Sequence, residues 1–213
     1  RQRQMCIRDR YQTGSPKVDG QGVVQYGIPS LAMVGVFVGL GLAFLMAFKP
    51  HLARFVAPIY ALAQGVFVGS VSRAFEEFYD GIVIQAAGAT MAVTAVMLGM
   101  YLTGIIRVTD RFRKIVISAT LGLMLFYLVT WVVSLLGGNV SFLSSPSLMS
   151  IGFSVLVVGL AAMNLALDFD FIERGAQSGL PKHFEWFAAF GLLVTLVWLY
   201  LEILRLLAKM RDR

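Results

Sequence analysis

The sequence IGFSVLVVGLAAMNLALDFDFIER, residues 151–174, decides the fold of this chain. It is an apolar run long enough to cross a bilayer as a helix, which takes about 20 residues. Its end carries three acids, Asp168, Asp170 and Glu173. A carboxylate at membrane depth is costly without a partner or water, so each acid is a candidate functional group. The alternative is that they mark the water interface, which we expect for Asp170 and Glu173.

The rest of the chain is equally apolar. Hydrophobic residues fill 58% of its 213 positions, charged residues only 14%, and the mean hydropathy is +0.76. A soluble domain of this length carries more charge. A membrane barrel would instead show short alternating strands. We therefore predict an all-α, polytopic membrane bundle whose six spans lie near residues 27–48, 55–78, 81–103, 115–136, 148–174 and 184–207.

The sequence outside the spans is polar. Residues 1–25 are basic and contain Gly, which predicts a disordered or non-native tail. Residues 26–208 are expected to form a single transmembrane helical domain, and residues 209–213 a basic tail. The turn between the last two spans is predicted within GAQSGLPKH, at Gly179 and Pro181.

Basic residues gather in the connections after the first, third and fifth spans. These connections hold Lys49, Arg54, Arg107, Arg111, Arg113, Lys114, Arg174 and Lys182. The positive-inside rule places such loops in the cytoplasm. The basic N-terminal tail would then lie outside, so we expect a helix upstream that this sequence lacks. The basic C-terminus argues against this orientation, unless the last helix re-enters the membrane without crossing it.

Polar side chains inside the last two spans are the main candidates for an ion site. Asn164 and Asp168 are four residues apart and Thr195 and Glu202 seven apart, so each pair shares a helical face. If the two helices form an antiparallel hairpin with its turn at Pro181, Asp168 lies opposite Thr195. A turn further along, near residue 185, would bring Asp168 to Glu202 instead. Both partners stay open.

Two carboxylates within about 4 to 6 Å of each other share protons, because their like charges oppose full ionisation. Asp168 and Glu202 could therefore act as a pH-sensitive latch. Their oxygens also suit a hard cation such as Ca²⁺, as a bound or a permeant ion. We predict no other cofactor.

Local charge pairs offer another interpretation of Glu202. It could pair with Arg205, three residues on, or with Arg73. A secondary charge cluster is predicted where Arg73 precedes Glu76 and Glu77 by three and four residues, because one helical face can hold all three. The alternative for this cluster is a solvated interfacial group.

Three stretches resemble a known family. They are LALDFDFIERG (165–175), IRVTDRFRK (106–114) and VTLVWLYLEILRLL (194–207). All three are similar to the bacterial branch of the Bax inhibitor family, also called transmembrane Bax inhibitor motif proteins, and the similarity covers roughly residues 27–210. The resemblance implies seven helices and a pH-sensitive calcium leak across the bacterial inner membrane.

The resemblance also implies a pair of acids on the last two helices. Asp168 matches the acid of the penultimate helix. Matching LYLE to the family's LYLD selects Glu202 as its partner, whereas matching the terminal leucine-rich ending selects Thr195. The family suggests a second function as well, a non-catalytic regulator of membrane quality-control proteases or stress pathways that acts through helix contacts.

Other function classes fit the sequence less well. A single cysteine, Cys6, excludes an internal disulfide framework, and with only His51 and His183 a structural zinc site is not expected. We expect no catalytic activity, because both histidines lie at interfaces and an aspartyl pair of Asp80 and Asp168 would need opposite membrane faces to meet. The expected partners are the lipid bilayer, calcium or protons, and a membrane protease. Nothing in the sequence suggests nucleic acid.

Overall fold

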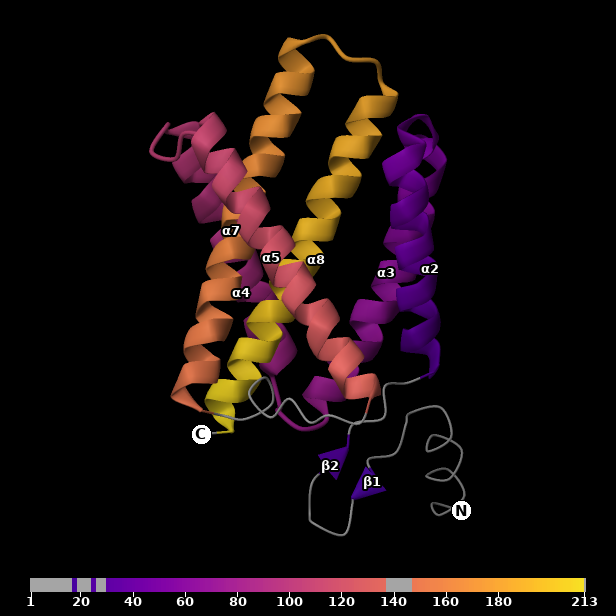
Figure 1. Ribbon diagram of the computed structural model, residues 1–213, viewed down its shortest axis with the longest axis vertical. Helices are drawn as coiled ribbons and strands as arrows, with labels where there is room; N and C mark the ends of the chain where they lie inside the picture. The colour runs from indigo at the N-terminus through magenta and orange to yellow at the C-terminus, as the bar shows by residue number, and fades with distance from the viewer. Residues whose placement is uncertain (1–16, 19–23, 26–29, 137–146, 213) are drawn as a thin grey trace. The chain divides into compact units, whose positions relative to one another are not determined.

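The computed structural model describes residues 17–18, 24–25, 30–136 and 147–212 (Figure 1). The helices are α2 Ser30–Phe48, the short 3₁₀ helix η1 Pro50–Leu52, α3 Ala53–Glu76, α4 Ile82–Leu102, α5 Asp110–Leu135, α7 Leu148–Gln177 and α8 His183–Arg211. Two strands, β1 Lys17–Val18 and β2 Val24–Gln25, pair antiparallel. The predicted all-α class with six long helices is confirmed. Most of the predicted tail at residues 1–25 and the start of the first predicted span lie outside the described residues.

Two units make up the chain, residues 1–74 and residues 75–213. In the first unit α2 ends at Phe48, just before Pro50, as expected because proline cannot continue a helix. Gly39 of α2 lies against α3, since a Cβ built on it would meet the Gln64 amide nitrogen at 3.1 Å. Gln64 in turn donates to the Tyr60 hydroxyl at 2.8 Å.

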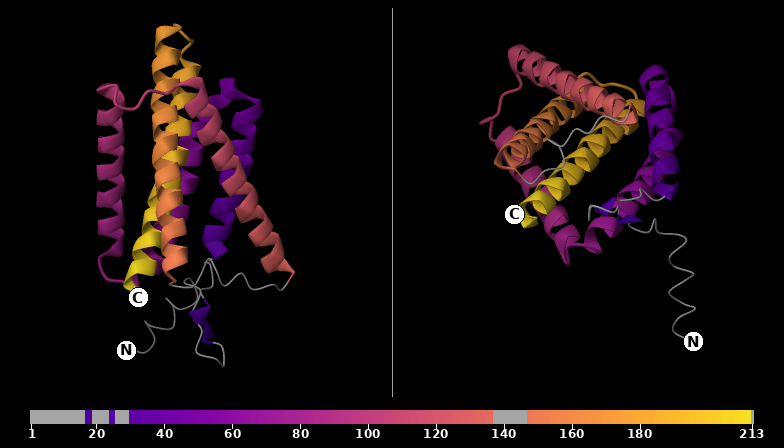
Figure 2. Two further views of the ribbon diagram at one scale, coloured as in Figure 1. Left: turned by 60° about the vertical axis from the view of Figure 1, so that its left-hand side comes forward. Right: turned by 60° about the horizontal axis from the view of Figure 1, so that its bottom comes forward.

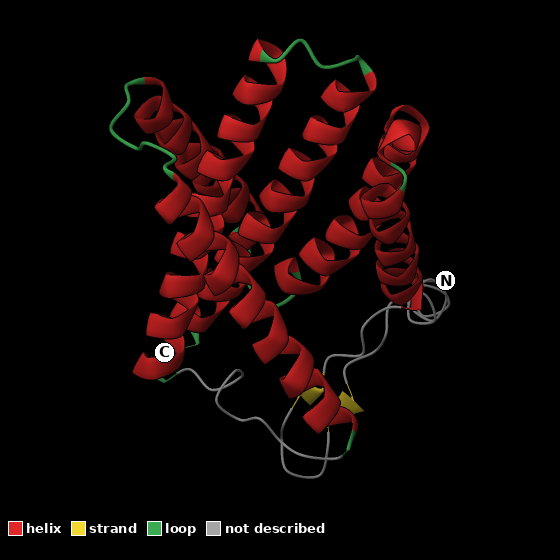
Figure 3. Cartoon of the chain, turned by 45° about the horizontal axis from the view of Figure 1, so that its top comes forward, coloured by secondary structure: helices red, strands yellow, loops and turns green. Residues whose placement is uncertain are grey.

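The second unit is built around α7, which packs against α4, α5 and α8. α7 and α8 run side by side as an antiparallel hairpin (Figures 1 and 2). The apolar core between α5 and α7 contains Val116, Leu123, Val157 and Leu160, and Trp198 of α8 packs against it. The α4–α5 connection and the α7–α8 turn lie at the same end of this unit (Figure 3).

Five helices in the described part of the chain are long and apolar enough to cross a membrane. Large apolar side chains cover their outer faces. Examples at least 60% exposed are Leu62, Ile84, Met91, Leu121 and Leu156. Such faces suit lipid, because hydrocarbon tails solvate them as well as a protein core does.

The α7–α8 turn lies where Gly179 and Pro181 predicted it. α7 ends at Gln177, and Gly179 has a φ of 61°, which favours glycine. Both helices are longer than predicted, because α7 continues three residues beyond Arg174 and α8 continues through Lys209 to Arg211. The first three residues assigned to a basic tail are thus helical.

α5 begins earlier than predicted. The expected start was residue 115, but the helix starts at Asp110 because Thr109 caps it, its Oγ1 accepting from the Phe112 amide at 3.2 Å. Asp110 also suits the positive end of the helix dipole. The basic residues Arg111, Arg113 and Lys114 therefore belong to a helix and not to a loop.

We expect Gly175→Ala to destabilise the hairpin by about 1–3 kcal/mol, the usual cost of overpacking. A Cβ at this position would lie 2.2 Å from the Phe184 ring, so the ring has to move. Thermal unfolding of the full chain in detergent measures the effect. Gly159→Ala is the matched control, because nothing lies within 4 Å of its Cβ position. An equal loss of stability in both variants would contradict this prediction.

Candidate functional site

Asp168 lies on α7 and faces α8. Its carboxylate shares a side-chain hydrogen bond with Thr195. Gly191, one turn before Thr195, also lies against it, since a Cβ there would be 3.8 Å from Asp168 Oδ1. The other oxygen, Oδ2, is buried and has no hydrogen-bond partner among the described residues. The hairpin thus holds a carboxylate that is only half satisfied.

The position of the turn explains why Thr195 is the partner of Asp168. Of the two open alternatives, a turn at Pro181 brings these two residues together, and the turn lies there. Glu202 is seven residues further along α8, about 10.5 Å along its axis. The two acids therefore do not form the latch or the paired Ca²⁺ site considered from the sequence. In the described ranges, no group of three or more His, Cys, Asp or Glu side chains is placed to hold a metal ion.

Glu202 has partners of its own. It is 3% exposed, and the Arg205 guanidinium donates to its Oε1 at 2.9 Å. The Tyr127 hydroxyl of α5 also donates to Oε1, at 3.2 Å. Arg205 further contacts the face of the Tyr127 ring, 5.8 Å from its centroid. Of the two local pairs considered from the sequence, the one with Arg205 is present.

Asn164 faces a different helix from Asp168. Its Nδ2 donates to Thr120 Oγ1 of α5 and to the Leu160 carbonyl, both at 2.9 Å. Positions four apart differ by about 40° around a helix, which is enough to turn neighbouring side chains towards α5 and α8. The amide and the acid therefore line one stretch of α7 but have separate partners.

Asp170 forms ion pairs that were not predicted from the sequence. It is only 8% exposed, and it binds Arg113 of α5 at 2.5 Å and Arg174 of its own helix at 2.9 Å. The pair with Arg113 was missed because Arg113 was assigned to a loop, whereas it lies in α5. Glu173 is exposed, as expected, and accepts hydrogen bonds from Tyr101 of α4 and from Gln177.

We expect Asp170→Asn to lower the free energy of unfolding by about 1.5–3 kcal/mol, the usual range for hydrogen bonds to charged groups. Both arginines keep some access to water, so the loss stays below that of an isolated buried charge. Chemical unfolding in mixed micelles measures it. Glu173→Gln, which removes an exposed acid of the same helix end, is the control. An Asp170 variant no less stable than this control would contradict the expectation.

The predicted cluster of Arg73, Glu76 and Glu77 has a structural use. Glu76 accepts from the backbone amides of Gly81 at 2.7 Å and Val83 at 3.0 Å, so it satisfies donors at the start of α4. A positive φ of 76° at Gly81 lets the chain turn back on itself there.

The same end of this unit holds the last basic residues of α8. Arg211 donates to the Asp80 carbonyl at 2.9 Å and to Gln85 at 3.0 Å, and Tyr79 donates to Asp212. Asp80 is thus close to Arg211, which lies about 24 Å along α8 from Thr195. Asp80 and Asp168 therefore cannot form a catalytic pair within this unit.

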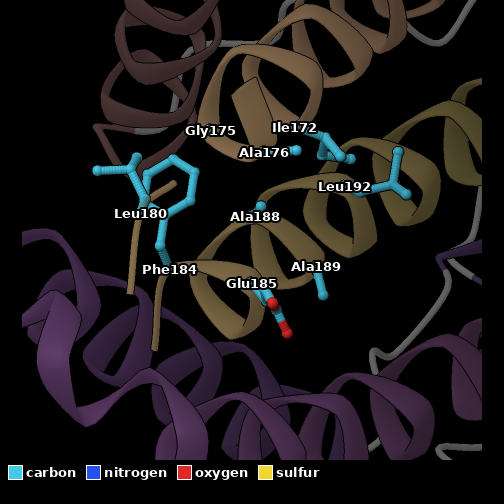
Figure 4. Close-up of a pocket in the computed structure, with 9 residues that line it drawn as sticks. All are labelled: Ile172, Gly175, Ala176, Leu180, Phe184, Glu185, Ala188, Ala189 and Leu192. Atoms are coloured by element: carbon cyan, nitrogen blue, oxygen red, sulfur yellow. The ribbon is translucent and has the colours of Figure 1, made fainter. Parts of the chain in front are cut away.

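A pocket of about 500 Å³ lies near the α7–α8 turn. Its lining residues are Ile172, Gly175, Ala176, Leu180, Phe184, Glu185, Ala188, Ala189 and Leu192 (Figure 4). Glu185 is the only charged member of this set, and Asp168 is not among them. The pocket is therefore a mainly apolar hollow, separate from the acid at the centre of the hairpin.

Several residues of the site were not singled out from the sequence. Arg113 was assigned to a loop and Lys209 to a tail, and no site role was predicted for Tyr127. Spacing within a helix does not reveal contacts between helices, so their partners could not be found that way.

Comparison with known families gives one match. A family model described as Bax inhibitor 1 like matches residues 15–212. No curated protein and no solved structure matches the chain.

Proposed function

Because the chain belongs to the Bax inhibitor 1 like family and is a multi-pass membrane protein, we propose that it is a pH-sensitive, calcium-permeable leak in a bacterial inner membrane. Asp168 is its ion-facing acid. The observation that carries this proposal is the buried Asp168 Oδ2, which has no hydrogen-bond partner among the described residues although it lies within a long apolar helix. Such an oxygen is open to a cation or a proton.

Neutral oxygens lie close to this acid. Thr195 contacts it from α8, and the Asn164 amide, which donates to the Thr120 hydroxyl of α5, lies one turn away along α7. Calcium prefers ligands of this kind, carboxylates together with neutral oxygens and water. A proton on Asp168 removes the negative charge that attracts the cation, which makes the flux depend on pH. Glu202 is already neutralised by Arg205, so Asp168 acts without a second acid.

Flux into liposomes tests the proposal. Vesicles that contain the full chain should take up Ca²⁺ faster than protein-free vesicles of the same lipid, and uptake should change between about pH 5 and pH 8, where carboxyl groups in membranes titrate. Uptake equal to that of protein-free vesicles at every pH would contradict the proposed leak.

We propose no catalytic role for this chain. Asp80 lies beside Arg211, which is about 24 Å along α8 from Thr195, the neighbour of Asp168. Cleavage of a membrane substrate by the purified chain, lost on Asp168→Asn, would contradict this view.

A second candidate function is the non-catalytic regulator of membrane proteases. Four small residues form an exposed stripe on α4: Gly88, Ala92, Ala95 and Gly99. The two glycines have no atom within 4 Å of their Cβ positions, so the described residues leave this stripe uncovered. Stripes of small residues let helices approach each other closely in lipid. Capture of a membrane protease that is lost on Gly88→Ile but kept on Asp168→Asn would favour this function over the leak.

We propose that the connections after α2, α4 and α7 face the cytoplasm. They hold the basic residues Lys49, Arg107 and Lys182, which the positive-inside rule keeps on that side. In a Cys6→Ser background, a cysteine placed at position 182 should react with an impermeant reagent only after the cell membrane is opened. Labelling of intact spheroplasts would contradict this orientation.

A further inference from the structure

Lys209 is a buried cation without an acid. It is 7% exposed, and its ammonium donates to Ser154 Oγ of α7 at 2.9 Å. Within the described residues it forms no salt bridge, and Glu202, whose charge acts on it, is committed to Arg205. An ammonium has three donors, so one hydroxyl leaves it incompletely satisfied. A buried charge in this state is costly unless an anion completes it.

Ser150, on the same helix as Ser154, is a second anomaly. It is 1% exposed, and its Oγ has no hydrogen-bond partner among the described residues. It precedes Ser154 by four residues, so both hydroxyls lie on one face of α7.

The register of the hairpin places Ser150 against Lys209. Asp168 contacts both Gly191 and Thr195, which are one turn apart on α8. Moving 14 residues towards the start of α7 and 14 residues towards the end of α8 converts the pair of Asp168 and Thr195 into the pair of Ser154 and Lys209, which is the observed hydrogen bond. Moving 18 residues in the same directions converts the pair of Asp168 and Gly191 into the pair of Ser150 and Lys209. By register, both serines therefore face Lys209, whose ammonium donates to Ser154.

The surroundings favour a negative ligand. Ser150 lies in the first turn of α7, whose amide groups give the helix start a partial positive charge. Two further acids at this end are already engaged, Glu76 by backbone amides and Asp212 by Tyr79. The start of α7 and the last turns of α8 also lie at the same end of two membrane-length helices. The ends of such helices are at the depth of the lipid phosphates.

We propose that Lys209, Ser150 and Ser154 form a binding site for a phosphate group. The ammonium supplies the charge, the two hydroxyls supply hydrogen bonds, and the start of α7 adds its dipole. The phosphate of an anionic lipid and free inorganic phosphate share this chemistry. This site is independent of the proposed leak, because it lies about 21 Å along α7 from Asp168.

Thermal unfolding of the full chain tests the site with two probes. One is inorganic phosphate added to the protein in a zwitterionic detergent, and the other is nanodiscs of phosphatidylcholine with or without phosphatidylglycerol. We expect the unfolding midpoint to rise with at least one of them. A rise with phosphate alone identifies the free anion, and a rise only with phosphatidylglycerol identifies the lipid headgroup.

Three variants assign the effect to the site. Lys209→Met should fold, because replacing a buried charge with an apolar side chain is often neutral or stabilising, and should weaken the response to the anion about tenfold. Lys209→Arg should keep the response, and Ser150→Ala should weaken it about threefold. Lys182→Met removes an exposed lysine at the other end of the unit and is the matched control.

Two results would overturn the proposal. The first is a wild-type chain whose stability responds to neither probe. The second is an equal loss of response in Lys182→Met and Lys209→Met, because this would show general attraction between a basic protein and an anion.

Discussion

Asp168→Asn is expected to lower Ca²⁺ uptake into liposomes by about tenfold at neutral pH and to remove most of its pH dependence. A tenfold loss corresponds to about 1.4 kcal/mol, a modest value for one charge interaction with a cation. Asparagine is close in shape to aspartate and keeps an oxygen that Thr195 can reach. The change therefore removes the charge and the proton site with little disturbance of the hairpin.

Two further variants distinguish charge from shape at this position. Thr195→Val removes the hydroxyl that contacts Asp168 while keeping its volume, so uptake should persist with a changed pH dependence. Glu173→Gln removes an exposed acid from the same helix and should leave uptake unchanged. If Asp168→Asn transports Ca²⁺ like the wild type across the pH range, Asp168 is not the ion-facing acid.

Arg205→Gln is expected to be the most destabilising single change among the charged residues, at about 2–3 kcal/mol. It leaves Glu202 buried, with the Tyr127 hydroxyl as its remaining hydrogen-bond partner among the described residues. Loss of one member of a fully buried pair costs about 3–5 kcal/mol, and the partial exposure of Arg205 reduces this. Unfolding of the full chain in mixed micelles measures the change.

A double-mutant cycle gives this prediction its control. Arg205→Gln combined with Glu202→Gln removes the stranded charge, so the double variant should recover much of the lost stability. If the double variant instead loses as much stability as the two single variants together, Glu202 and Arg205 do not stabilise each other.

The sequence predicts the helices of this protein well, because each is a long apolar run bounded by polar residues. It also predicts the turn at Pro181, and the contact of Asp168 with Thr195 follows from that turn alone. The contact of Asp170 with Arg113 could not be predicted in this way. It depends on the start of α5, which the Thr109 cap moves into a segment that looks like a basic loop.

Residues at the far end of α8 were missed for a similar reason. Lys209 follows the last apolar run, so composition assigns it to a polar tail. Its burial depends on α8 remaining helical for another turn and on small serines facing it from α7. Such a fit between two helices depends on the register of a hairpin, which composition does not contain.

The hydrogen bonds between the start of α4 and the end of α8 affect the order in which the second unit assembles. At the end of α8, Arg211 donates to the Asp80 carbonyl and to Gln85, and Asp212 accepts from the Tyr79 hydroxyl. Synthesis proceeds from the N-terminus, so α4 enters the membrane well before these partners leave the ribosome. Until then this end of α4 has to rely on water, on lipid headgroups or on an insertion factor. The second unit can therefore complete its assembly only after Arg211 and Asp212 have been translated.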